Sequence, residues 1–147
     1  MSEAPSETNV VRVPASSTLG REALALRHEV FVLEQGVPVE EEIDEDDATA
    51  THFVAIYEGE IVGTLRVVFR PEHAKIGRVV VRRERRELGI ARRMMIFAME
   101  YCKALGVNRF YLTAQVDKLG LYEKLGFVTF GPQFLDAGIP HLAMKTY

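Results

Sequence analysis

The sequence lacks the features of a secreted or membrane-bound protein. It contains one cysteine, Cys102, so no disulfide can form within the chain. No apolar stretch approaches the roughly 20 residues that a membrane-spanning helix needs. The N-terminus has neither the basic nor the apolar region of a signal peptide. We therefore expect a cytoplasmic protein without a membrane partner, in which Cys102 is a small core residue.

The sequence also shows no sign of a second domain. The 147 residues contain no internal repeat, low-complexity tract or linker, and their number suits one domain with one core. Hydrophobic residues make up 48% and charged residues 27%, which is typical of a globular protein. We expect a flexible polar tail over residues 1–8 and a single domain over residues 9–147.

The charges are segregated, although the formal net charge is only −3. Residues 40–47 read EEEIDEDD, and seven arginines lie between Arg78 and Arg93. One concentrated basic stretch in a net-acidic protein indicates a local anion site. Because no aromatic residues interleave the arginines, we expect no nucleic-acid partner. The acidic run is predicted to be a solvated loop; the alternative is a surface that attracts a cationic substrate.

The hydrophobic patterns alternate between strand and helix periodicity, which predicts a mixed α+β domain. Gly36 and Pro38 end the first helix, and Gly106 ends the long one. A loop containing glycine and proline is expected between the last two strands. Strands are predicted at residues 9–13, 51–57, 61–69, 76–81, 109–116, 127–130 and 142–146, and helices at residues 19–33, 90–105 and 117–125.

The segment from Val79 to Met95 carries the strongest functional pattern. A predicted strand ends in three valines, a polar loop follows, and a long helix begins after Gly89. Backbone N–H groups at a helix start are unpaired and partly positive, so they suit a diphosphate. Gly89 lets a phosphate approach the backbone because it has no side chain. The residues expected to bind the diphosphate are Arg86, Glu87, Leu88, Gly89, Ile90, Ala91 and Arg92, with Arg93 as a further positive charge beside the helix start.

Two motifs in this order resemble the GCN5-related N-acetyltransferase (GNAT) superfamily. Arg86-x-x-Gly89-x-Ala91 is similar to its Arg/Gln-x-x-Gly-x-Gly/Ala signature, and residues 121–127 (LYEKLGF) are similar to its second motif. Residues 26–38 (LRHEVFVLEQGVP) and 137–141 (AGIPH) resemble the ElaA-like acetyltransferases in particular. The resemblance covers nearly the whole chain. It implies the GNAT fold, a mixed central sheet of about seven strands flanked by about four helices.

The resemblance also implies an activity. The expected enzyme is an N-acetyltransferase that transfers the acetyl group of acetyl-CoA directly to a primary amine of a small molecule or peptide, in a ternary complex and without a metal. Pantetheine is expected to pair like a strand with the backbone of Val79, Val80 and Val81. Gln115 replaces an asparagine that the superfamily often has seven residues before Tyr122. The alternative is a non-catalytic acyl-CoA sensor, and monomer and homodimer both stay open.

Three residues are candidates for catalysis. Tyr122 matches the superfamily position whose hydroxyl faces the sulfur, so we expect a general acid, with core packing as the alternative. His141 and Met144 are similar to the Gly-Pro-His-x-x-Met run of glyphosate-type N-acetyltransferases, where the histidine is the base. A structural histidine is the alternative. Glu34, at the end of the first predicted helix, is a rival base or amine-binding residue, and His52 is expected to be structural.

Overall fold

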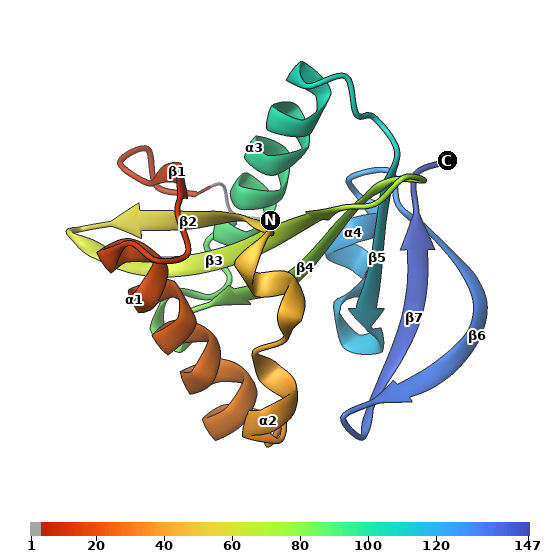
Figure 1. Ribbon diagram of the computed structural model, residues 1–147, viewed down its shortest axis with the longest axis horizontal. Helices are drawn as coiled ribbons and strands as arrows, with labels where there is room; N and C mark the ends of the chain where they lie inside the picture. The colour runs from red at the N-terminus through yellow and green to blue at the C-terminus, as the bar shows by residue number, and fades with distance from the viewer. Residues whose placement is uncertain (1–3) are drawn as a thin grey trace.

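The computed structural model of the protein describes residues 4–147, and residues 1–3 of the expected tail lie outside the described part. Seven strands form one mixed sheet in the order β1-β2-β3-β4-β5-β7-β6, which confirms the expected GNAT fold (Figure 1). The strands are β1 (Asn9–Val13), β2 (Thr51–Tyr57), β3 (Glu60–Phe69), β4 (Ala74–Val81), β5 (Phe110–Gln115), β6 (Val128–Asp136) and β7 (Ile139–Lys145).

Helices cover both faces of the sheet (Figure 1). α1 (Thr18–Arg27) and α2 (Val39–Glu42) lie on one face, and α3 (Ile90–Ala104) lies on the other. α4 (Leu119–Glu123) follows β5. The first helix was predicted as one regular element, but its second half is the π-helical segment η1 (His28–Glu34). The predicted loop before β7 is wrong as well, because β6 extends to Asp136 and forms a hairpin with β7.

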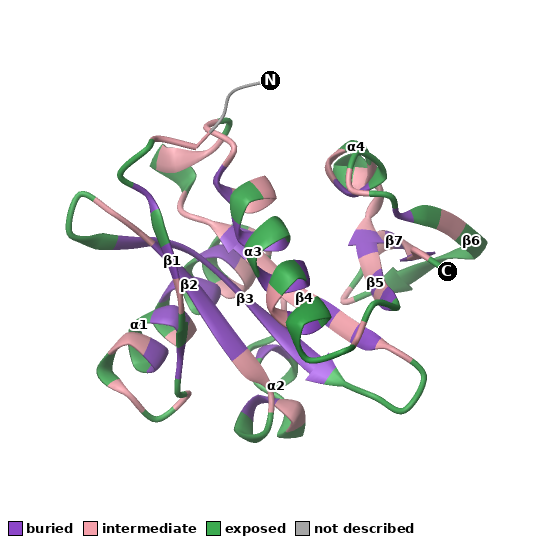
Figure 2. Ribbon diagram, turned by 90° about the horizontal axis from the view of Figure 1, so that it is seen from above, coloured by how far each residue is buried: buried purple, intermediate pink, exposed green. Residues whose placement is uncertain are grey.

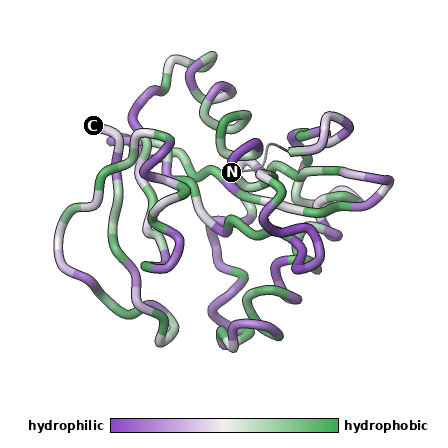
Figure 3. Tube along the Cα trace, turned by 180° about the vertical axis from the view of Figure 1, so that it is seen from behind, coloured by the Kyte–Doolittle hydropathy of each residue, from purple (hydrophilic) through white to green (hydrophobic). Residues whose placement is uncertain are grey.

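The larger of two core clusters lies between α3 and the sheet, and a smaller cluster packs under α1, around Ala23 and Leu26. One side of α3 is fully buried, at Met94, Met95, Ala98 and Cys102. Hydrophobic and hydrophilic residues alternate along this helix (Figure 3). Figure 2 shows the same alternation of buried and exposed residues in α3, next to strands that are buried along most of their length. The expectation of a small core residue at Cys102 is confirmed, and burial raises the pKa of its thiol to about 11.

β4 contains a bulge that changes its direction. Arg66 of β3 pairs with Gly77, whereas Thr64 pairs with Val80, so two residues of β4 oppose one residue of β3. Arg78 lies in the bulge with a φ of 52°, a left-handed conformation that is uncommon for a side-chain-bearing residue. β4 is parallel to β5, but they pair only through Ala74–Phe110 and Lys75–Tyr111. Beyond these positions the two strands separate.

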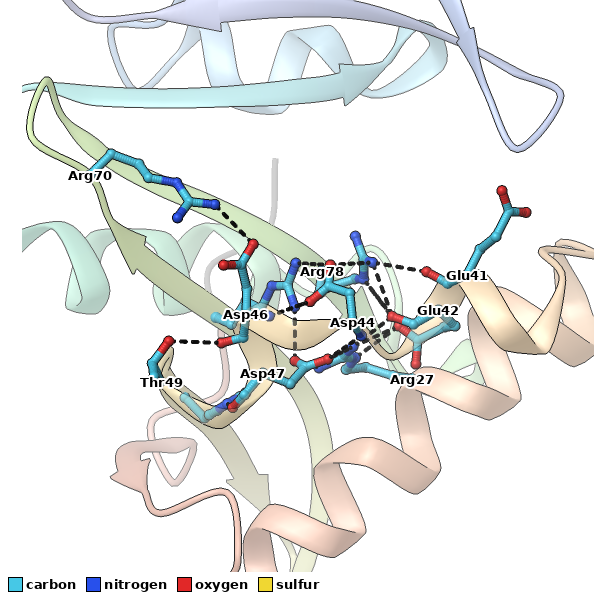
Figure 4. Close-up of polar contacts among 11 residues, drawn as sticks. Arg27, Glu41, Glu42, Asp44, Asp46, Asp47, Thr49, Arg70 and Arg78 are labelled. Carbon is cyan, nitrogen blue, oxygen red and sulfur yellow. Dashed lines mark hydrogen bonds and ion pairs between the residues drawn. The ribbon is translucent and has the colours of Figure 1, made fainter.

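The acidic segment is partly buried, which corrects the prediction of a solvated loop. Arg27 is 2% exposed and donates hydrogen bonds to Glu42 at 2.8 Å and to Asp47 at 2.6 Å. Arg66 binds Asp44 at 2.7 Å and Asp47 at 2.9 Å. Arg78 also contacts Glu42 and Asp44 (Figure 4). We call these six residues the charge network: Arg27, Arg66, Arg78, Glu42, Asp44 and Asp47.

The charge network is balanced in sign and fixes the acidic segment against the sheet. Burial acts to raise the pKa of Asp47, but hydrogen bonds from Arg27 and Arg66 and from the Asp44 amide outweigh it and place the pKa below its ordinary value. The Arg66 hydrogen bond lowers the pKa of Asp44 in the same way. The carboxylates of Asp44 and Asp47 therefore stay ionised at neutral pH. The sequence alone did not predict the burial of these carboxylates, because their partners Arg27 and Arg66 lie far from the acidic segment along the chain.

Removing Arg27 is expected to destabilise the fold strongly. Arg27→Ala leaves two buried carboxylates without their main partner, which costs about 3 kcal/mol or more. The matched control is Arg70→Ala, which removes the ion pair between Arg70 and Asp46. The Arg70 side chain is 42% exposed, so this variant should lose less than about 1 kcal/mol of stability. Urea unfolding of both variants measures the difference. Equal losses of stability would show that the network is no more important than a surface pair.

Candidate active site

A groove of about 880 Å³ runs from the end of β4 to the start of α3, and we call it the β4–α3 groove. It contains most of the residues predicted to bind the cofactor. Its lining includes Val79, Val80, Val81, Arg86, Glu87, Gly89, Ile90, Ala91, Arg92 and Tyr122. The strand end, the loop and the helix start thus share one surface, as the sequence pattern indicated.

The start of α3 has the properties of an anion site. Gly89 is the N-cap residue with a φ of 80°, and no side chain caps the helix. The first intrahelical hydrogen bond runs from the Arg93 amide to the Gly89 carbonyl at 3.1 Å, so the preceding amides have no acceptor within the helix. Arg92 adds a full positive charge in the same groove. This donor set fits a diphosphate.

Two residues expected at the cofactor do not line this groove. Leu88 does not line the β4–α3 groove, and its side chain packs against the hydrophobic core instead. Gln115 lies outside this groove and donates a hydrogen bond to the Gln35 amide oxygen at 2.9 Å. Conversely, the groove includes Gly120, which no local pattern had singled out, and Lys118, which stands where the superfamily often has a small residue three after Gln115. These residues belong to η4 (Val116–Lys118) and α4, the two elements that follow β5.

Glu34 lies in the β4–α3 groove, where it forms a two-pronged ion pair with Arg86. One guanidinium nitrogen of Arg86 is 2.8 Å from the carboxylate, and Nε donates to the Val81 carbonyl at 3.0 Å. The Arg86 hydrogen bond lowers the pKa of Glu34, so the carboxylate is a weaker base than an unpaired glutamate. The role of Glu34 as a base or amine-binding residue stays a prediction, and its pairing with Arg86 disfavours it.

A second cavity of about 580 Å³ occupies the space where β4 and β5 separate, and we call it the β4–β5 cavity. It shares Gln35, Val79, Lys118 and Tyr122 with the β4–α3 groove. Two molecules bound in the groove and in the cavity would therefore meet at these residues. A smaller space of about 100 Å³, the mouth, adjoins the cavity between η1–α2 and the β6–β7 turn.

Tyr122 lies at the junction of the groove and the cavity. Its side chain belongs to α4 and is 8% exposed, and burial raises the pKa of its hydroxyl to about 12. Within the described residues, only Thr8 has a fully buried side-chain polar atom without a hydrogen-bond partner. The Tyr122 hydroxyl has no protein partner either, but it is not among the fully buried atoms. It therefore has access to the cavity that Tyr122 lines. At neutral pH it is protonated and can donate a hydrogen bond or a proton.

His141 lies across the same cavity on β7, opposite Gln115 of β5. The residue is 9% exposed, and its Nδ1 is 2.7 Å from the Ile139 carbonyl oxygen. A carbonyl only accepts hydrogen bonds, so we infer that Nδ1 carries the proton and that Nε2 presents a lone pair. The geometry suits a base. His52 lines none of these spaces and contacts the Asp47 carbonyl at 2.9 Å.

Comparison with known proteins identifies the family. Residues 15–147 match the family model described as an acetyltransferase (GNAT) domain. The chain belongs to the GNAT acetyltransferases. Over 126 residues it is 39% identical to the N-acetyltransferase YjcF of Bacillus subtilis, covering 84% of this chain and 89% of YjcF. In the part of the GNAT chain that the structure describes, no helix is long and apolar enough to cross a membrane.

Solved structures of this family match over nearly their full length. An acyl-CoA N-acyltransferase from Pseudomonas aeruginosa is 30% identical, with a TM-score of 0.82 and coverage of 95% of this chain and 98% of the other. Escherichia coli ElaA is 28% identical, with a TM-score of 0.83 and coverage of 96% and 99%. The likeness to ElaA-like GNAT proteins inferred from the sequence motifs is confirmed.

A glutamate at position 89 is expected to abolish coenzyme A binding. Gly89→Glu introduces a side chain and a negative charge where the diphosphate would contact the start of α3. Gly106→Glu is a matched control, because Gly106 has a φ of 85° at the other end of α3 and adds the same charge and strain. Titration calorimetry with coenzyme A should show at least about a tenfold loss for the first variant only. Equal effects would remove α3 from the binding site.

Proposed function

We propose that the protein transfers the acetyl group of acetyl-CoA to a primary amine of a small molecule or peptide, directly and within a ternary complex. The observation that carries the proposal is the junction of the β4–α3 groove with the β4–β5 cavity at Val79 and Tyr122. A donor in the groove and an acceptor in the cavity would place their reacting ends side by side. Proximity of this kind supplies a large part of the rate acceleration in transfer reactions.

The groove suits each part of coenzyme A. The uncapped start of α3 suits the diphosphate, together with Arg92. The edge of β4 that faces the separated β5 offers main-chain groups to the amides of pantetheine, from Val79 to Val81. The bulge at Arg78 turns this edge just before Val79, so main-chain donors there are available to polarise the thioester carbonyl.

His141 and Tyr122 suit opposite ends of the proton transfer. The amine must lose a proton as its nitrogen forms a bond to the carbonyl carbon, and the free lone pair on His141 Nε2 suits it as acceptor. As the carbon–sulfur bond breaks, the Tyr122 hydroxyl can protonate the departing thiolate and recover its proton from solvent. The net products are an amide and a thiol. We assign the base to His141 and not to Glu34, because Glu34 is paired with Arg86.

Direct transfer is favoured over a covalent acetyl-enzyme. The single cysteine of the chain, Cys102, is fully buried in the core and lines neither the groove nor the cavity. Its raised pKa also disfavours the thiolate that would attack the thioester. No cysteine is therefore placed to carry the acetyl group between the two substrates.

Replacing the Tyr122 hydroxyl tests turnover against simple acyl-CoA binding. Tyr122→Phe should lower kcat about tenfold to a hundredfold while the affinity for coenzyme A stays unchanged. Tyr101→Phe is the control, because Tyr101 lies on α3 outside the groove and the cavity. Thiol release from acetyl-CoA with a panel of amines gives the rates. Thermal stabilisation by coenzyme A without thiol release from any amine would favour a sensor.

The pH dependence of kcat/KM identifies the base. In His141→Gln, the fall in rate toward acidic pH that comes from protonation of the base should disappear, together with about a hundredfold of the rate. Glu34→Gln is expected to keep the wild-type limb, because Glu34 has a lowered pKa and remains a carboxylate across the neutral range. An acidic limb that survives in His141→Gln but vanishes in Glu34→Gln would reverse the assignment.

A further inference from the structure

The acceptor side of the site has an unbalanced charge at the mouth of the β4–β5 cavity. In the charge network, Arg27, Arg66 and Arg78 face Glu42, Asp44 and Asp47, so the arginines that approach the cavity are neutralised. Two further carboxylates line the mouth, those of Glu41 and Asp136. Among the described residues, neither forms an ion pair. The mouth therefore carries an excess of negative charge.

The two carboxylates come from opposite walls of the mouth. Glu41 belongs to α2, and Asp136 ends β6 at the hairpin turn. Arg78 contacts the main-chain carbonyl of Glu41 at 3.3 Å and leaves the carboxylate free. Figure 4 shows the Glu41 side chain directed away from the charge network. Phe31 and Ile139 line the same space and provide apolar surface between the charged groups.

A second observation, the unpaired nitrogen of His141, points to a ligand in this space. His141 lines both the mouth and the larger cavity, is nine-tenths buried, and presents Nε2 without a protein hydrogen-bond partner. The Tyr122 hydroxyl also lacks a partner and has access to the cavity. The described chain supplies a hydrogen-bond partner to neither of these two groups. The carboxylates thus lie next to unpaired proton-transfer groups, in one continuous space.

We propose that the acceptor is a diamine-type molecule with a second, protonated amino group that binds between Glu41 and Asp136. The inference rests on the proposed function, since it assigns the β4–β5 cavity to the acceptor. The reacting amine lies near His141 and Tyr122, and the aliphatic chain contacts Phe31 and Ile139. A distal cation gains from the two carboxylates, whereas an uncharged end does not. Because both carboxylates are exposed, the gain is modest.

Three amines of equal chain length test the distal charge. Cadaverine ends in a second ammonium, pentylamine in a methyl group and δ-aminovalerate in a carboxylate. Calorimetry on the protein saturated with coenzyme A should show cadaverine binding about tenfold more tightly than pentylamine, with δ-aminovalerate the weakest. The double variant Glu41→Gln and Asp136→Asn should bind cadaverine and pentylamine equally. The control Glu45→Gln, an exposed residue of the same acidic segment outside these spaces, should keep the preference.

The outcomes separate the inference from the proposed function. Equal binding of cadaverine and pentylamine, tighter binding of δ-aminovalerate, or a preference that survives in the double variant would overturn the diamine site. Thiol release assays on the same proteins add the second arm. Selective cadaverine binding without thiol release from any amine would overturn the transferase and keep the cation site. Thiol release with equal KM for all three amines would keep the transferase and overturn the cation site.

Discussion

β4 and β5 pair at only two positions, Ala74–Phe110 and Lys75–Tyr111, and the binding surfaces of the protein depend on their separation beyond that point. A fully paired parallel sheet would satisfy the main chain of β4 from both sides and leave no space between the strands. Separation frees the β4 edge near Val79 and opens the β4–β5 cavity at once. The groove and the cavity are therefore two consequences of a single interruption in the sheet.

The charge network complements this interruption. A gap between two strands exposes polar main-chain groups. It persists only if the neighbouring segments are held in place and do not fill it. The segment from Val39 to Ala48 supplies one wall, because Arg27 and Arg66 bind its buried carboxylates and Arg78 reaches it from the bulge of β4. Buried ion pairs contribute little to net stability but penalise any arrangement that leaves one partner alone. In this fold they specify where the acidic segment lies.

Local signals explain which parts were predictable from sequence. The periodicity of α3 and the glycine at its start are encoded within a few residues, so the helix and the position of its start were predicted correctly. The π-helical turn at His28–Glu34 was missed, since its apolar spacing differs little from that of a regular helix. Gln115, predicted at the cofactor, does not line the groove, because no local pattern records that β5 separates from β4. Glu42 and Asp47 were predicted to be solvated for a similar reason, since their arginine partners are distant in sequence.

The ion pair between Glu34 and Arg86 gives the free protein an internal occupant for one of its own anion-binding groups. If the groove binds a diphosphate as proposed, the ligand competes with Glu34 for Arg86, and its contact with this arginine requires that the ion pair break. Dissolved salt weakens the pair within the protein and the contact with the ligand together. Under the proposed function, we therefore expect ionic strength to affect cofactor binding less than the number of arginines in the groove suggests.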